Sequence, residues 1–182
     1  MVRAVCGTRR YDYLSGPITG GVRVRDAYDR TKNEPSARDG TGWFDQVKAE
    51  NIEALLVRAN AIRADEGVVI IEPGSFEAGD LEGWGQREYL DLWEQVIAEH
   101  SQHVRFIEGW QYSSGCVVEF RCAKRHDRPT LDEDGNEISR EEAARLVDAA
   151  ITDLETSRVR SPTVGDKLEH LVKRLKEERA LL

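Results

Sequence analysis

The feature of this sequence that most constrains its fold is an alternation of short apolar runs with longer amphipathic patterns. Residues 68–71 (VVII) form a continuous apolar run, which is typical of a strand covered on both faces of a sheet. Further β-prone runs lie at residues 11–14, 104–107 and 129–131. Because helical patterns separate these runs, the sequence predicts an α/β fold, with a parallel sheet of about four to five strands and helices on both faces.

Apolar residues recur at intervals of three and four in several further segments, which we expect to be helices. These segments are residues 43–64, 87–100, 116–123, 140–154 and 167–182. Residues 22–42 are polar, contain Pro35 and Gly40, and lack a sustained period. We therefore expect a long loop there, with a helical turn at most, and loops of this length often act as lids.

The chain of 182 residues is long enough to form one sizeable hydrophobic core. We expect an α/β domain over residues 1–138, followed by a C-terminal helical extension over residues 139–182. Ser139 and Glu142 have the spacing of a capping box, which marks the start of a helix. The apolar stripe of the last helix packs either on the domain or on another subunit, and we expect a homo-oligomer.

The charge balance limits the possible partners. The chain has 26 Lys and Arg against 34 Asp and Glu, which gives a formal net charge of −8 and a pI near 5.1. An acidic protein of this kind is unsuited to long nucleic acid, because such binding neutralises phosphates with cations. A single nucleotide in a locally positive pocket remains compatible with this balance.

The spacing of cysteine and histidine indicates neither a disulfide framework nor a structural metal site. Cys6, Cys116 and Cys122 are scattered along the chain, as are the four His. We therefore expect a protein of the reducing cytoplasm that uses no metal and no cofactor. The N-terminus lacks the apolar core of a secretion signal and no apolar run has the length of a membrane span, so we expect no membrane association.

Residues 104–123 contain the strongest candidate for a reactive group. A polar loop at residues 113–115 (SSG) leads from a β-prone run into an apolar helix, and Glu119 lies near the first turn of that helix. Burial removes water from this carboxylate while the positive helix end favours its ionised form, and such an anion can act as a nucleophile. The backbone N–H groups of the loop suit a phosphate or a sugar hydroxyl. In the plainer interpretation, Glu119 is a helix N-terminal acid that reaches water.

Two further segments carry candidate site residues. The first strand runs into a Gly-rich turn at residues 15–21 (SGPITGG), where backbone can approach a ligand closely; an ordinary turn is the alternative. Asp91 lies at the edge of the apolar face of the helix expected over residues 87–100. The loop before this helix opens toward the carboxyl end of a strand, where α/β sites lie, so Asp91 is a candidate acid, although most such residues are merely solvated.

Two segments together resemble the nucleoside 2-deoxyribosyltransferase-like superfamily. Residues 13–20 (YLSGPITG) resemble that family's opening turn, Tyr-hydrophobic-Ala-Gly-Pro. Residues 109–119 (GWQYSSGCVVE) resemble the Gly-Trp…Ser-x-Gly-Ala-x-x-Glu segment of a phage and bacterial branch. Residues 69–73 (VIIEP) also fit the family's second strand, and the likeness covers residues 11–129.

The resemblance implies a flavodoxin-like fold and cleavage of the N-glycosidic bond of a nucleoside or nucleotide. Glu119 matches the family's nucleophile, Tyr13 matches the Tyr that holds it, and Asp91 matches the helix Asp that contacts or protonates the leaving base. The residues expected around the substrate are Ser15, Gly16, Pro17, Gly109, Trp110, Ser113, Ser114 and Gly115. Of these, Ser113 and Gly115 match the loop that meets the sugar 5′ side or a 5′-phosphate.

The sequence also departs from the family's pattern. Members commonly have an Asp at the start of the third strand, where this chain has Gln102 and His103, so recognition of the base stays open. The C-terminal Asn that some transferases lend to a neighbouring subunit has no match here. Three hypotheses remain: an enzyme that transfers deoxyribose between bases or hydrolyses nucleoside 5′-monophosphates, a non-catalytic sensor that binds a nucleotide, and a structural protein that assembles through its last helix.

Overall fold

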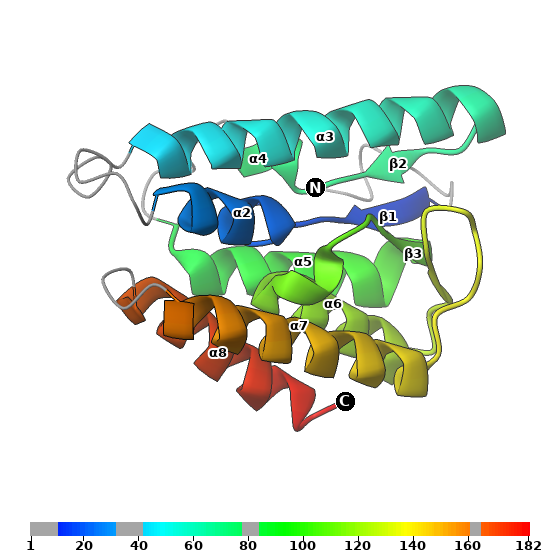
Figure 1. Cartoon of the computed structure of the whole chain (residues 1–182). Coiled ribbons are helices and arrows are strands. Elements are labelled where there is room, and N and C mark those ends of the chain that lie inside the picture. Colours follow the sequence, from blue (N-terminus) through cyan, green and yellow to red (C-terminus); the bar gives the residue numbers. More distant parts are fainter. Residues whose placement is uncertain (1–10, 32–41, 78–83, 161–164) are drawn as a thin grey trace.

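The computed structural model describes residues 11–31, 42–77, 84–160 and 165–182 (Figure 1). Within them, four strands form one all-parallel sheet in the order β2-β1-β3-β4. The strands are β1 (Tyr11–Ser15), β2 (Ile70–Ile71), β3 (Ser101–Phe106) and β4 (Thr130–Leu131). This order is that of a flavodoxin-like sheet, so the expected α/β fold is confirmed.

Helices flank the sheet and follow the apolar periods of the sequence. They are α2 (Val22–Thr31), α3 (Gly42–Glu66), the single turn α4 (Gly74–Glu77), α5 (Gln86–His100), α6 (Ser114–Arg125), α7 (Arg140–Arg160) and α8 (Gly165–Arg179). The helices expected from periodicity are confirmed, with ends that differ by a few residues, because apolar spacing marks a buried face better than it marks a cap. Among these described helices, none combines the length and the apolar character that a membrane span requires.

Residues 22–42, which were expected to form a loop, are helical in their first half. Helix α2 buries Val24 and Ala27, each 4% exposed and three residues apart on one side of the helix. Two buried residues among charged neighbours make too short a stripe to stand out as a period. Residues 32–41, and the chain break expected at residues 161–163, lie outside the described residues.

The alternation of side chains along β1 separates two layers of the core. Tyr13 points to one face of the sheet, where it contacts Trp93 of α5 and Glu119 of α6. Leu14 points to the other face and belongs to a separate buried cluster with Leu55 of α3. Figure 1 shows the same layers, with α3 on one side of the sheet and α5 and α6 on the other.

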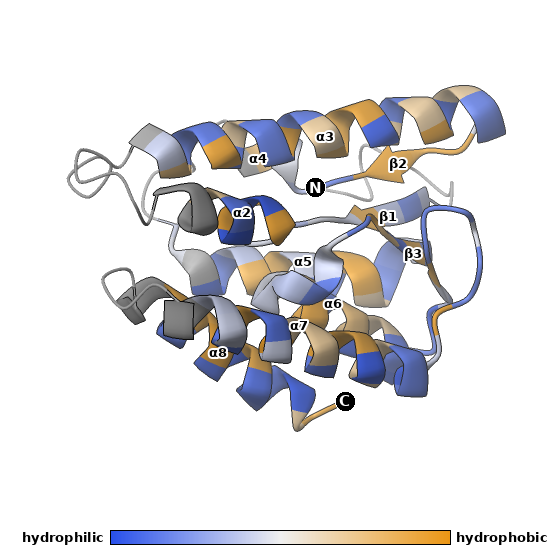
Figure 2. Ribbon diagram, viewed as in Figure 1, coloured by the Kyte–Doolittle hydropathy of each residue, from blue (hydrophilic) through white to orange (hydrophobic). Residues whose placement is uncertain are grey.

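The two C-terminal helices pack on the rest of the chain. The stripe of α8 buries Leu168, Val172 and Leu175 in the main core cluster, against α6 and α7. An ion pair joins Arg121 of α6 to Glu178 of α8 at 2.6 Å. Figure 2 shows hydrophobic residues along α7 and α8 as stripes between polar ones. The last helix is thus covered within the chain, and the expected homo-oligomer stays a prediction.

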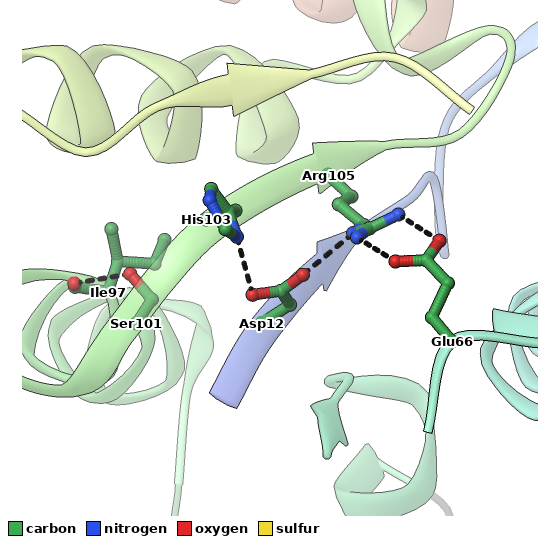
Figure 3. A network of polar contacts seen from close by, with 6 residues as sticks. All are labelled: Asp12, Glu66, Ile97, Ser101, His103 and Arg105. Atoms are coloured by element: carbon green, nitrogen blue, oxygen red, sulfur yellow. Dashed lines mark hydrogen bonds and ion pairs between the residues drawn. The ribbon is translucent and has the colours of Figure 1, made fainter. Parts of the chain in front are cut away.

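On the face of the sheet that Leu14 and α3 share, polar and charged side chains form a network around the buried Asp12 and Arg105 (Figure 3). Asp12 on β1 is 3% exposed; its carboxylate accepts a hydrogen bond from Arg105 Nε at 2.8 Å and lies 2.9 Å from His103 Nδ1. The Arg105 guanidinium also donates to both oxygens of Glu66, at 2.7 and 2.5 Å. This network joins β1 and β3 to the end of α3.

Candidate functional site

The candidate site is built around the carboxylate of Glu119, which α6 brings beside the end of β1. Tyr13 and Ser15 are two residues apart on β1, so both side chains point to the face that α6 covers. Tyr13 OH donates to Glu119 Oε1 at 2.6 Å, and Ser15 Oγ donates to Glu119 Oε2 at 2.5 Å. Hydroxyl donors therefore hold both oxygens of a carboxylate in a residue that is 6% exposed.

The position of Glu119 within α6 differs slightly from the expected one. Ser113 caps the helix, and its hydroxyl accepts a hydrogen bond from the backbone N–H of Cys116 at 3.5 Å. Because α6 begins at Ser114, Glu119 lies in the second turn of the helix rather than the first. The positive helix end acts mainly within the first turn, so the two hydroxyls contribute more to holding the carboxylate than the helix end does.

The buried carboxylate shifts the pKa values of its neighbours. Burial, followed by the charge of Glu119 and its hydrogen bond, raises the pKa of Tyr13 well above the usual value. Burial and the same charge raise the pKa of the Cys116 thiol to about 12. Tyr13 therefore stays a neutral donor near neutral pH, and Cys116 stays a thiol, which is a poor nucleophile. Within this cluster, Glu119 is the group suited to nucleophilic attack.

A cavity of about 390 Å³ lies in front of Glu119, beside the turn that follows β1. Its walls come from that turn, from residues 113–116 at the start of α6, from Lys48 of α3, and from apolar side chains of α5 and α8. The volume lies in the range of small-molecule sites, and α/β proteins bind their ligands at the carboxyl ends of strands. The wall of one ligand-sized space thus includes both a carboxylate and an ammonium group.

The expected site residues divide into those that line this cavity and those that do not. The ones that line it are Gly16, Ser113, Ser114, Gly115 and Glu119. Tyr13 and Ser15 reach it through their hydrogen bonds to Glu119. The structure therefore brings together the turn, the loop and the carboxylate from the two segments that carry the resemblance.

Asp91, the expected acid, lies outside this group. Its side chain is 74% exposed, and its carboxylate is 4.0 Å from Arg87, one turn earlier on α5. The residues of α5 that line the cavity are Tyr89, Leu90 and Trp93. Residues two apart on a helix point about 200° apart, so a helix that turns Tyr89 toward the cavity turns Asp91 away from it. The structure does not support Asp91 as the acid.

Pro17, Gly109 and Trp110 are not among the described residues that line the cavity. Trp110 is 4% exposed and stacks on Phe120, with ring centroids 5.2 Å apart. Gly109 has φ +82°, a left-handed conformation that favours glycine, and it begins the 3₁₀ turn that leads into α6. Pro17 lies on the outer side of its turn, where a Cβ at Gly21 would meet it at 2.7 Å.

Lys48 and several apolar residues of the cavity wall were not expected from the sequence. On the inward side of α3, the polar residues Lys48 and Asn51 lie between the apolar Val47 and Ile52. Polar residues in the core-facing stripe of a helix often mark a functional site, so this interruption was a usable signal. Leu171 of α8 gave none, because its place in the wall depends on how the last helix packs.

Neither a metal site among the described residues nor a similarity to known proteins identifies the function of this site. Among the residues that the structure describes, no three His, Cys, Asp or Glu side chains gather as a metal site. Comparisons of the chain with protein-family models, with curated proteins and with solved structures found no match. The family resemblance therefore rests on residues 13–20 and 109–119, and the function that follows is a proposal.

Proposed function

We propose that this protein cleaves the N-glycosidic bond of a nucleoside or nucleotide, with Glu119 as the nucleophile that attacks the anomeric carbon of the sugar. The observation that carries the proposal is the cluster of Tyr13, Ser15 and Glu119. It presents a buried carboxylate, oriented through both of its oxygens, at the wall of a ligand-sized cavity. The motifs at residues 13–20 and 109–119 support the same chemistry.

The geometry suits the charge that this reaction develops. Breaking a glycosidic C–N bond builds positive charge on the sugar ring. A carboxylate fixed beneath the anomeric carbon stabilises that charge and forms a glycosyl ester as the bond to the base breaks. The hydroxyls of Tyr13 and Ser15 orient Glu119 for this attack and stabilise its negative charge when the ester opens again. The sugar then passes to a second base or to water.

The leaving base needs a proton, and Asp91 does not supply it in this arrangement. Glu119 is the one carboxyl group among the described residues that line the cavity. We therefore propose that solvent water protonates the leaving base. Such a site favours bases that accept a proton readily. Turnover measured with a series of bases should therefore be fastest for the bases that are most easily protonated.

The glycosyl ester has two possible fates. The sugar passes to another base, which makes the protein a transferase, or to water, which makes it a hydrolase, for example of nucleoside 5′-monophosphates. Lys48 and the backbone N–H groups at the start of α6 lie in the same cavity wall, and both kinds of group attract a phosphate. This observation favours the 5′-monophosphate as the substrate. Lys48→Met should then raise the KM for dAMP by about tenfold and leave the KM for deoxyadenosine unchanged.

Product analysis and trapping of the intermediate test the proposal. The protein is incubated with deoxyadenosine plus thymine, and separately with dAMP, and chromatography follows base exchange or base release. A 2-fluoro-2-deoxynucleoside should halt the reaction at the ester, because fluorine disfavours the charge that the ester must develop to open. Peptide mass spectra should then place the fluorosugar on Glu119, with the Glu119→Gln protein unlabelled. Turnover with the label on another residue, or no turnover with any nucleoside or nucleotide, would contradict the proposal.

A non-catalytic nucleotide sensor is the main alternative, because the same cavity would hold a ligand without turnover. A sensor would show a rise in Tm with nucleotide and no release of base. A structural protein that assembles through α8 would show no shift in Tm with any nucleotide. Light scattering measures the assembly state in either case and tests the expected homo-oligomer.

A further inference from the structure

The turn between β1 and α2, residues 16–21, is held by one buried side chain of α3. Asn51 is 2% exposed, and its Nδ2 donates to the carbonyl oxygens of Ile18 at 3.0 Å and Gly20 at 3.1 Å. Arg23 Nη1 donates to Asn51 Oδ1 at 3.1 Å. One amide group thus satisfies two carbonyls of the turn, while a guanidinium fixes the orientation of that amide.

Directed hydrogen bonds are important here because the turn separates two cavities. Its inner side lines the cavity in front of Glu119. On its outer side, a second cavity of about 300 Å³ is lined in part by Pro17, Arg23 and Asn51. Cavities on two sides reduce the van der Waals contacts that fix the turn, although Gly16 packs closely on Leu55 and Ile107, so the hydrogen bonds from Asn51 contribute to its position.

The turn is also fixed to the loop before α6. The backbone N–H of Gly21 donates to the carbonyl oxygen of Tyr112 at 3.3 Å, and a Cβ at Gly20 would lie 3.2 Å from that same oxygen. The turn therefore lies close to residues 113–115, which form another wall of the first cavity. Movement of the turn relative to Asn51 would change the spacing of two walls that flank the ligand.

We propose that Asn51 is a positioning residue: it holds the turn at the distance from residues 113–115 that the substrate requires, and Arg23 holds Asn51. This inference rests on the proposed function, because it assigns the first cavity to the substrate. Asn fits the role because Asp would set an oxygen against two carbonyl oxygens, and an apolar residue would leave both carbonyls without this donor. A wall held in place before binding reduces the ordering that binding must supply.

Asn51→Asp tests the inference, and Asn60→Asp is its matched control, because it makes the same change at an exposed position on α3. We expect Asn51→Asp to raise KM by about tenfold while kcat stays within about threefold. Amide hydrogen exchange at residues 18–21 should become about tenfold faster while exchange in α7 is unchanged. Asn60→Asp should match the wild type in every measurement.

A folded Asn51→Asp protein with unchanged KM and unchanged exchange would overturn the inference. Faster exchange throughout the chain, with KM unchanged, would also overturn it, because that pattern belongs to a purely structural residue. If Asn51→Asp does not fold, Arg23→Met decides the question: it removes the partner of Oδ1 and should raise KM by about threefold, whereas an unchanged KM overturns the inference. If the wild type releases no base, the proposed function fails. Amide exchange at residues 18–21 in Asn51→Asp then still decides whether Asn51 positions the turn: faster exchange supports this role, and unchanged exchange overturns it.

Discussion

Glu119 and Asp12 are both buried carboxylates that meet β1, one on each face of the sheet, and their partners differ. Asp12 is 3% exposed, and the guanidinium of Arg105 donates to it at 2.8 Å. Glu119 is 6% exposed and accepts hydrogen bonds from the neutral hydroxyls of Tyr13 and Ser15. The first carboxylate lies within a network of charged side chains, and the second lies at the wall of a cavity.

Under the proposed function, one strand meets both a structural acid, Asp12, and a reactive one, Glu119. The positive charge of Arg105 compensates the negative charge of Asp12, and this ion pair joins β1 to β3. The hydroxyls of Tyr13 and Ser15 donate to the two oxygens of Glu119 and add no charge of their own, so these bonds orient the carboxylate and leave its nucleophilic character intact. Because both carboxylates are buried, the hydrogen bonds that they accept, more than the degree of burial, distinguish the structural acid from the proposed nucleophile.

The largest effect should come from Glu119→Gln. Gln keeps the shape of the side chain, and the hydroxyls of Tyr13 and Ser15 can rotate to accept as well as donate, so the fold should persist. The amide is not a nucleophile, and we expect turnover to fall by about a thousandfold or more. Base release and thermal unfolding, measured on the same preparation, check both statements. Normal turnover in Glu119→Gln would remove the contrast with Asp12 altogether.

The next largest effect should come from Asp12→Asn, which should lower stability and leave activity nearly unchanged. The change leaves the charge of Arg105, whose side chain is 9% exposed, without its buried counter-ion, although Glu66 still binds it. We expect the free energy of unfolding in urea to fall by about 3 kcal/mol, with kcat/KM within about twofold.

A double variant, Asp12→Asn with Arg105→Met, is the control for this comparison. It removes the stranded charge together with its partner, so it should recover part of the lost stability. A double variant that is less stable than Asp12→Asn alone would show that Arg105 acts mainly through Glu66.

The two carboxylates also differ in how well the sequence predicts them. Glu119 was predictable because a loop with a capping Ser precedes an apolar helix, and a single acid among apolar residues stands out within that segment. The network of Asp12 and Arg105 depends on the register between β1 and β3, with Asp12 one residue before Tyr13 and Arg105 beside Leu14. No local pattern states which residues of two distant strands will lie side by side.

The cavity wall was predicted only in part, from the turn at Gly16 and the loop at residues 113–115. Lys48 and Leu171 reach it from helices whose placement is set by packing of the whole chain. Asp91 is instructive, because the structure places it outside the cavity wall although it lies only two residues from both Tyr89 and Trp93 in the sequence. The rotation of a helix about its axis decides which residues at the edge of an apolar face are covered, and tertiary contacts fix that rotation.

Tyr13→Phe sharpens the comparison by removing one neutral donor from Glu119. Loss of a hydrogen bond to a buried charged group should cost about 2 kcal/mol of stability, and we expect turnover to fall by about tenfold. Because the pKa of Tyr13 is raised in the folded protein, above pH about 10 the unfolded chain loses this proton while the folded chain keeps it. The contribution of Tyr13 is therefore fully present below that pH.

Above that pH, the contribution of Tyr13 to the free energy of unfolding falls by about 1.4 kcal/mol per pH unit until the folded pKa is reached. Urea unfolding at a series of alkaline pH values measures this slope. The Tyr13→Phe protein should lose stability less steeply than the wild type over the same range. Equal slopes would show that the hydroxyl of Tyr13 ionises with its ordinary pKa and is not held by Glu119.

The smallest effect should come from Asp91→Asn. Its side chain is 74% exposed and lies 4.0 Å from Arg87, and an exposed pair of this kind contributes little. We expect kcat, KM and Tm to match the wild type, and kcat measured over bases of graded leaving ability is the decisive assay. Glu119→Gln and Asp91→Asn both remove one carboxylate from a helix that borders the cavity, so unequal results would isolate the effect of orientation. A selective loss of rate with poor leaving groups in Asp91→Asn would instead mean that α5 turns when substrate binds and brings Asp91 to the base.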